Sequence, residues 1–164
     1  MRTAARRTIL LAIMLLVALI VATLAWAFGI PPARHLYYAV LPTADQNLAA
    51  RLAVNVSRLS LSRLDYCPTD TTWPDTPIGF LVAAVHNEAD KDWFPAVLSS
   101  LVRVGCDVNA YNQAGLTPLM SSALFGHQWV GPVLLSSGAN PGLRSKSVGR
   151  SNGLSAAEIA ERSR

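Results

Sequence analysis

The sequence predicts an all-α fold of short helix–turn–helix units, preceded by one transmembrane helix. Three features support this prediction: an apolar run near the N-terminus, an apolar stretch of helical periodicity that ends at Gly105, and the pair Thr117-Pro118 that opens the next stretch. Glycine accepts the left-handed backbone that ends many helices, and Thr followed by Pro is typical of a helix start. We expect about two to three such units and an N-terminal capping helix.

Composition limits the kinds of partner. The 164 residues leave room for one modest domain and an accessory segment. Of the 14 basic residues, Arg2, Arg6 and Arg7 precede the apolar run, which leaves 11 basic residues against 10 acidic ones in the rest of the chain. Nucleic-acid binding needs clustered positive charge, so this balance argues against a nucleic-acid partner.

Residues 1–32 are predicted to be a signal anchor. Residues 9–30 form an apolar run that would span roughly 30 Å as a helix, the thickness of the hydrocarbon core of a bilayer. Pro31-Pro32 end the run, and the arginines before it place the N-terminus in the cytoplasm. The folded part would then face the periplasm from the inner membrane. If the segment is instead a signal peptide cleaved after Ala27, the folded part is secreted into the periplasm.

Residues 33–75 are predicted to be a linker and a capping helix. Leu48, Leu52, Val56 and Leu59 recur at a spacing of three to four, which indicates one apolar helical face. An array of stacked units needs such a cap because its terminal unit otherwise exposes apolar surface. The stretch Asp65–Asp75 contains Pro, Asp and Thr and is expected to be a loop.

Residues 76–164 are predicted to hold the stacked units. Thr76-Pro77 has the form of a helix opening, but we prefer Gly79 as the capping position because that register aligns Leu81 and Ala84 with the apolar residues expected after such an opening. It also brings the length of this helix pair closer to that of the next one. In the second of these helix pairs, Pro132 is expected to lie several residues into a helix, where it would remove a hydrogen bond and kink or delay that helix.

A third opening follows near the C-terminus. Ser155 is expected to cap a helix, and Glu158 lies three residues later, which is the pattern of a capping box. The charges of this last helix fit an outward polar face. We therefore expect a truncated C-terminal unit that closes the array.

The stretch Gly105–Met120 reads Gly-Cys-Asp-Val-Asn-Ala-Tyr-Asn-Gln-Ala-Gly-Leu-Thr-Pro-Leu-Met. It resembles the junction between two ankyrin repeats, whose usual form is G-A-D-V-N-A-x-D-x-x-G-x-T-P-L-H, and Cys106, Asn112 and Met120 are the departures. The resemblance covers about Ile78–Arg164 and implies an ankyrin-repeat solenoid. The positions that match the structural pattern of the family are Gly105, Gly115, Thr117, Pro118, Leu119, Ala123, Gly126, His127 and Gly138.

Ankyrin arrays usually bind other proteins on the concave face that their turns and inner helices form. By this resemblance, the candidate partner contacts are Tyr111, Asn112, Gln113, Ser121, Leu124, Phe125, Arg144 and Lys146. Tyrosine and arginine are enriched among interface hot spots. For Leu124 and Phe125, the alternative is packing between units.

The chain has two cysteines, Cys67 and Cys106. In an oxidising compartment they can form a disulfide that ties the loop after the capping helix to the junction at Gly105. Alternatively, Cys106 replaces a small residue and Cys67 is a free thiol in a loop. The sequence leaves both alternatives open.

No catalytic signature is present in the sequence. It lacks a Gly-x-Ser-x-Gly nucleophile motif, a phosphate-binding loop and a His-Glu-x-x-His metal pair. His127 stands where ankyrin repeats commonly carry a structural Gly-His pair. We therefore expect no catalysis, no cofactor, no metal site and no small-molecule substrate.

These expectations describe a membrane-tethered module that binds another protein. Its architecture is similar to that of some periplasmic immunity proteins against type VI secretion effectors, which would make it a protein that neutralises or escorts a toxic or secreted partner. A cell-envelope scaffold that recruits a periplasmic enzyme fits the same residues. The remote alternative is a small hydrolase within Ala33–Asp75.

Overall fold

The computed structural model describes residues 14–17, 19–20, 54–55, 57–58, 61, 65–68, 75–85 and 88–163. The chain divides into two compact units, Met1–Pro31 and Pro32–Arg164. All regular structure in the described ranges is helical, so the all-α prediction is confirmed for them.

In the first unit, Met14–Val17, Leu19 and Ile20 are helical. Across the described ranges, no helix combines the length and the apolar character that crossing a membrane requires. Most of the predicted membrane segment, residues 9–30, lies outside the described residues, and so does Ala27 of the cleavage alternative. Both alternatives stay predictions.

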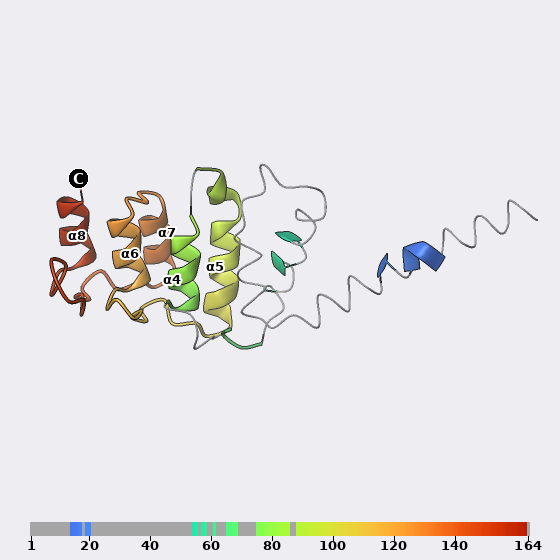
Figure 1. Cartoon of the computed structure of the whole chain (residues 1–164), viewed down its shortest axis with the longest axis horizontal. Helices are drawn as coiled ribbons and strands as arrows, with labels where there is room; N and C mark the ends of the chain where they lie inside the picture. The colour runs from blue at the N-terminus through green and yellow to red at the C-terminus, as the bar shows by residue number, and fades with distance from the viewer. Residues whose placement is uncertain are drawn as a thin grey trace, which may run out of the picture. The chain divides into compact units, whose positions relative to one another are not determined.

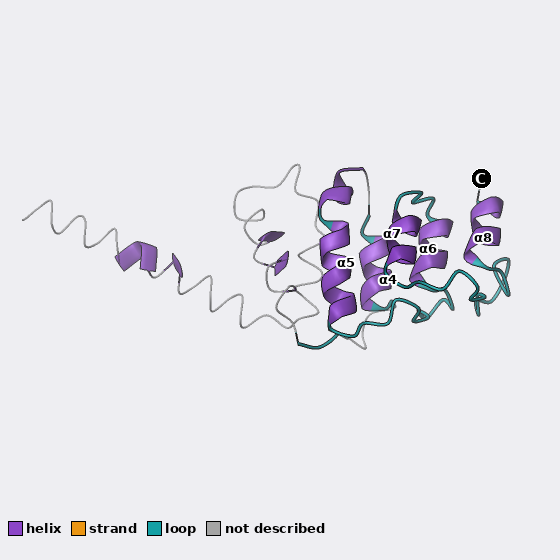
Figure 2. Cartoon of the chain, turned by 180° about the vertical axis from the view of Figure 1, so that it is seen from behind, coloured by secondary structure: helices purple, strands orange, loops and turns teal. Residues whose placement is uncertain are grey.

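The second unit consists of two layers of helices. One layer contains α4 (Pro77–Ala83), α6 (Pro118–Leu124) and α8 (Ala156–Arg162), which lie side by side (Figure 1). The 3-10 helix η1 (Glu88–Asp92) leads into α5 (Phe94–Arg103), which packs on α4, and α7 (Val130–Ser136) packs on α6. The long connections from α5 to α6 and from α7 to α8 gather at one end of the helices (Figure 2).

The three helices of the first layer begin in the same way. Thr76, Thr117 and Ser155 have extended backbones, and each hydroxyl oxygen accepts a hydrogen bond from the N–H three residues later, at 3.0, 3.4 and 3.3 Å. Each cap satisfies one of the N–H groups that the start of a helix leaves without a partner. The capping box of Ser155 and Glu158 is confirmed.

The preference for Gly79 as the first cap was wrong. Thr76 caps α4, and Gly79 lies inside the helix, where its N–H donates to that cap. The stretch from Thr76 to Gly105 is longer than that from Thr117 to Gly138. The extra residues are taken up by η1 and by α5, which has ten residues where α7 has seven. Equal spacing was therefore a poor guide to the register.

Three helices end on a glycine. Gly105, Gly126 and Gly138 have φ values of 86°, 73° and 95° after α5, α6 and α7. The N–H of each glycine donates to the carbonyl three residues back, and the next N–H donates to the carbonyl five residues back, at 3.0–3.3 Å. This Schellman arrangement satisfies carbonyls that the end of a helix leaves free, and it needs a left-handed residue at the glycine.

Pro132 lies in the first turn of α7, because that helix begins at Val130. The N–H groups of a first turn have no partner within the helix, so proline removes no hydrogen bond there. The predicted loss of a hydrogen bond and the kink do not occur.

The apolar core runs through both layers of the second unit. Leu81, Leu98 and Met120 are at most 1% exposed and represent three of its helices. Trp129 packs edge-on against Phe94, with ring centroids 5.3 Å apart, and so joins the start of α7 to α5. Burying each large apolar side chain stabilises the fold by about 1.5–3 kcal/mol, which makes this core the main source of stability.

Residues that precede α4 in the second unit also contribute to this core. Val54, Ser57 and Leu61 are helical and buried at a spacing of three to four, and Leu61 is part of the core cluster. These residues have the burial that a capping helix requires. The predicted apolar stripe lies outside the described residues; it comprises Leu48, Leu52, Val56 and Leu59.

A polar cluster attaches this segment to the start of α5. The guanidinium of Arg58 lies 5.1 Å from the centre of the Trp93 ring. The Trp93 indole N–H in turn donates to the Asp90 carboxylate at 2.8 Å. Burial lowers the pKa of Arg58, and the nearby Asp90 carboxylate partly offsets that effect.

The two long connections touch through their backbones at Gly115. Its carbonyl accepts a hydrogen bond from the N–H of Lys146 at 2.9 Å, and its φ is 74°. A Cβ at this position would lie 2.5 Å from the Lys146 carbonyl carbon and 2.6 Å from the Ser147 nitrogen. Only glycine allows both the left-handed backbone and this close approach.

We expect Gly115→Ala to lower the free energy of unfolding by about 2–5 kcal/mol, since left-handed strain costs about 1–2 kcal/mol and overpacking adds about 1–3 kcal/mol. Gly126→Ala is the matched control, because its φ is 73° but no atom lies within 4 Å of the added Cβ. Urea unfolding followed by circular dichroism checks both variants in the full chain. Equal losses for the two would contradict the close approach at Gly115.

Candidate partner-binding surface

The first connection (residues 105–117) and the second connection (residues 138–155) begin with the same local turn. In the first, the Asp107 carboxylate accepts a hydrogen bond from the N–H of Asn109 at 2.8 Å. In the second, the side-chain oxygen of Asn140 accepts from the N–H of Gly142 at 2.9 Å. Both are Asx turns placed two residues after the glycine that ends a helix. The repeated Gly-x-Asx spacing is the sequence signal that could have located them.

Hydrogen bonds hold the two connections side by side. The Asn109 side chain accepts from the N–H of Asn140 at 2.7 Å and donates to the carbonyl of Gly138 at 3.2 Å. The Tyr111 hydroxyl donates to the carbonyl of Arg144 at 2.9 Å. Two segments about thirty residues apart in the chain therefore form one continuous surface.

Asn112 joins the first connection to the residue that precedes the cap of α4. The side-chain NH₂ of Asn112 donates to the Asp75 carboxylate at 3.3 Å, and its side-chain oxygen accepts from the N–H of Leu116 at 3.0 Å. Burial raises the pKa of Asp75, while hydrogen bonds from Asn112 and from the N–H of Thr76 lower it to a smaller extent. An aspartate at position 112 would place a second carboxylate against Asp75, which explains the amide at this position.

Cys67 and Cys106 are joined in a disulfide bond with a Cα–Cα distance of 5.0 Å and a sequence separation of 39. Of the two alternatives that the sequence left open, the structure contains the bridge. Cys106 is 5% exposed and belongs to the core cluster. The bond ties the loop that contains Tyr66 and Pro68 to the start of the first connection.

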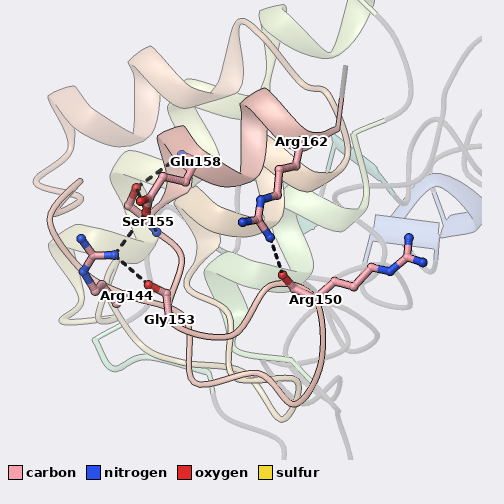
Figure 3. A network of polar contacts seen from close by, with 6 residues as sticks. All are labelled: Arg144, Arg150, Gly153, Ser155, Glu158 and Arg162. Atoms are coloured by element: carbon pink, nitrogen blue, oxygen red, sulfur yellow. Dashed lines mark hydrogen bonds and ion pairs between the residues drawn. The ribbon is translucent and has the colours of Figure 1, made fainter.

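A network of polar contacts links the second connection to α8 (Figure 3). The guanidinium of Arg144 donates to the carbonyl of Gly153 at 2.8 Å and pairs with Glu158 at 3.3 Å. The guanidinium of Arg162 donates to the carbonyl of Arg150 at 3.1 Å. These contacts hold residues 144–153 of the second connection against α8.

Glu158 is the acidic member of this network. Hydrogen bonds from the N–H and the hydroxyl of Ser155, at 2.7 and 2.8 Å, hold the pKa of Glu158 below its usual value. Arg144 and Arg162 lower this pKa further by a smaller amount. Glu158 therefore stays ionised and serves the helix cap and Arg144 together.

The predicted partner contacts on the two connections differ in accessibility. Gln113 and Lys146 are exposed, and the Lys146 ammonium lies 4.1 Å from the centre of the Tyr111 ring. Tyr111 and Asn112 are half-buried, and both are hydrogen-bonded to other segments of the second unit. Ser121 is 2% exposed, so the prediction that it contacts a partner is corrected: it is a buried residue of α6.

Leu124 and Phe125 lie elsewhere on the surface. They are 43% and 52% exposed, so about half of each side chain is accessible, and the alternative that they pack between units stays a prediction. They end α6, whereas the connections meet its start at Thr117, and a helix of seven residues, about 10 Å long, separates the two groups. Phe125 instead lies near His127, with ring centroids 5.8 Å apart.

A cavity of about 450 Å³ opens between α6, α7 and α8. Its lining is mostly small and apolar and includes Leu119, Ala123, His127, Leu135, Ala157 and Ala160. Sequence reasoning missed this cavity because its walls come from three helices, and no spacing within one helix indicates it.

Metal-binding groups are dispersed over the described part of the chain. There, no three side chains of His, Cys, Asp or Glu come close enough together to hold a metal ion. The polar contacts near the surface are instead those that position the two connections.

Comparison of the chain with protein-family models, curated proteins and solved structures found no match. The case for a function of this surface therefore rests on its own geometry.

We expect Asn112→Asp to lower the free energy of unfolding at pH 7 by about 1.5–3 kcal/mol, the usual worth of a hydrogen bond to a charged group. Repulsion between the two carboxylates would raise both pKa values above the unfolded ones. The loss is therefore present at neutral pH and fades as the pH falls through the raised pKa values. Urea unfolding at several pH values measures it. The exchanged pair Asp75→Asn/Asn112→Asp restores one amide and one carboxylate, and failure to recover stability would argue against this contact.

We expect Cys67→Ala/Cys106→Ala to be less stable than the wild type by about 4 kcal/mol, because the bridge restricts the unfolded chain over a long loop. The same urea experiment with and without reductant checks this. Reductant should destabilise the wild type by a similar amount and leave the double variant unchanged. Free thiols in the unreduced wild type would refute the bridge.

Proposed function

We propose that this chain is a short ankyrin-type array that binds another protein outside the cytoplasm, tethered to the inner membrane by its N-terminal segment. One observation carries the proposal: two connections from different helix pairs are hydrogen-bonded side by side through Asn109–Asn140 and Tyr111–Arg144. Together they form one surface that a partner can contact as a whole.

The recurrence of the same local structures supports the ankyrin assignment. Thr76 and Thr117 each precede a proline and cap a helix of seven residues. Gly105 and Gly138 each end the following helix and lead into an Asx turn two residues later. Recurrence of caps, helix ends and turns in the same order is what a stacked repeat requires.

Pre-organisation makes this surface suited to binding. Tyr111 and Asn112 use their polar groups to hold the connections in place, so the neighbouring exposed side chains are presented on a rigid frame. A rigid surface loses little conformational entropy when a partner binds, which favours affinity.

The disulfide supports a location outside the cytoplasm. Bridges such as Cys67–Cys106 form and persist in oxidising compartments and are rare in the cytosol. An apolar N-terminal run preceded by arginines fits export of the domain that follows. A small exported binding module of this design fits an immunity-like role, in which it neutralises or escorts a toxic or secreted effector.

A pull-down tests the binding proposal. Full-length tagged protein, solubilised from its own membranes in a mild detergent, is expected to recover one stoichiometric protein partner. We expect Gln113→Arg, on the exposed part of the first connection, to reduce the recovery at least about tenfold, because a bulky charge inside an interface is repulsive to the partner. Phe125→Ser is the control, since Phe125 is exposed but separated from the connections by the length of α6. No stoichiometric partner, or equal losses for both variants, would contradict the proposal.

A genetic experiment separates an immunity-like role from a scaffold that recruits a periplasmic enzyme. If the protein neutralises the captured partner, deletion of its gene should be toxic, and the toxicity should disappear when the gene of the partner is deleted as well. Viability of the single deletion under conditions that express the partner would favour the scaffold.

A further inference from the structure

Charge is distributed unevenly along the second unit. No charged residue occurs between Asp107 and Arg144, and no acidic residue occurs between Asp107 and Glu158. Arg144, Lys146 and Arg150 all lie in this acid-free stretch. The segment of residues 144–152, which we call the basic turn, therefore carries three positive charges and no carboxylate of its own.

The basic turn is fixed from both sides. The N–H of Ser145 donates to the carbonyl of Leu154 at 2.8 Å, and the N–H of Gly153 donates back to the carbonyl of Ser145 at 3.0 Å. The Ser145 hydroxyl is bonded to the N–H and the hydroxyl of Ser147, at 3.0 and 2.8 Å. The charges of the turn are thus presented on a backbone that is already ordered, which lowers the entropic cost of binding.

In residues 144–148 of the basic turn, exposed side chains alternate with buried or half-buried ones. Ser145 is buried and Ser147 is half-buried, while Arg144, Lys146 and Val148 are exposed. Val148 is as accessible as a free side chain, with a relative exposure of 103%. Alternation along an extended segment places these exposed side chains on one side of it.

Two of the three charges are not neutralised. Arg144 is paired with Glu158, but within the described part of the chain Lys146 and Arg150 have no ion pair. Lys146 lies over the Tyr111 ring, a contact that positions an ammonium and leaves its charge in place. Figure 3 shows the Arg150 side chain extending away from the network that holds its backbone.

We propose that the basic turn binds an acidic segment of the partner protein, in which carboxylates meet Lys146 and Arg150 and an apolar side chain meets Val148. This inference rests on the proposed function and adds the chemistry of the partner to it. Complementary charges steer association and select the correct partner, and an exposed apolar residue between them supplies contact area.

An anionic membrane or a nucleic acid fits this surface less well. Electrostatic attachment to lipid headgroups usually uses clusters of about four to eight basic residues, and a protein that contacts phosphates along a nucleic acid neutralises many of them. The basic turn offers only two charges that are not already paired, together with Val148. This number suits a short acidic stretch of a protein.

The test uses the full chain in phosphatidylcholine nanodiscs. The probe is a fluorescent peptide of alternating Glu and Leu residues, and its counterpart with Gln in place of Glu is the neutral control. Fluorescence anisotropy is expected to detect binding of the Glu peptide at low ionic strength and a steep loss at about 0.3 M salt, where charges are screened beyond several ångströms. The Gln peptide should bind at least about tenfold more weakly.

Charge-reversal variants locate the site. Lys146→Glu/Arg150→Glu should weaken binding of the Glu peptide at least about tenfold, and the milder Lys146→Gln/Arg150→Gln should weaken it by a smaller factor. Arg103→Glu lowers the net charge by two, as Lys146→Gln/Arg150→Gln does, and it is the control for that change because Arg103 is an exposed base at the end of α5. It should change binding less than about twofold. Circular dichroism confirms that each variant is folded.

Other results overturn the inference. Equal affinity of the wild type and the folded double variants would show that the basic turn is not the site. The same holds if the wild type does not bind the Glu peptide. Competition with lipid vesicles tests the membrane. If vesicles that contain phosphatidylglycerol displace the peptide at lower concentrations than unlabelled Glu peptide does, and pure phosphatidylcholine vesicles do not displace it, the turn would be assigned to the membrane instead. If the double variants recover a stoichiometric partner as well as the wild type does, the proposed function stands. Only the inference that an acidic segment of the partner binds the basic turn is then refuted.

Discussion

The length of the helices is the constraint on which the whole second unit depends. α4, α6, α7 and α8 have seven residues each, about two turns. A helix this short does not persist in water, because the cost of nucleation exceeds what a few hydrogen bonds return. Each helix is therefore stable only through its caps and through apolar contact with its neighbours. This is why the ends of the helices are so regular in sequence.

The same constraint accounts for the order in the connections. Adjacent short helices must be held in register, and the backbone contact at Gly115 together with the Asn109–Asn140 pair provides that register. The disulfide at Cys106 fixes the start of the first connection against the preceding segment. Ordering of the connections is thus part of stabilising the fold, and the candidate binding surface is a consequence of it. A partner would meet a surface whose shape is already set.

Local sequence predicted those parts of the fold that depend on backbone chemistry. Thr117-Pro118, Ser155 with Glu158, and the glycines at positions 105, 126 and 138 each act within a few residues of themselves, so their roles could be read directly. The wrong register at Gly79 has the opposite cause. It relied on aligning Leu81 and Ala84 with the next helix pair and on similar lengths of the two pairs. Nothing local requires similar lengths, because η1 and a longer α5 can absorb the difference.

The sequence by itself determined the starts of α6 and α8 and the end of α5, since caps and left-handed glycines satisfy backbone groups of their immediate neighbours. Only the tertiary structure decided which side chains are accessible. Ser121 is a buried residue of α6, whereas Leu124 and Phe125 are separated from the connections by the length of that helix. Lys146 lies over the Tyr111 ring from a different connection. These outcomes depend on contacts between residues distant in the chain, and such contacts follow from how the layers pack rather than from any local pattern.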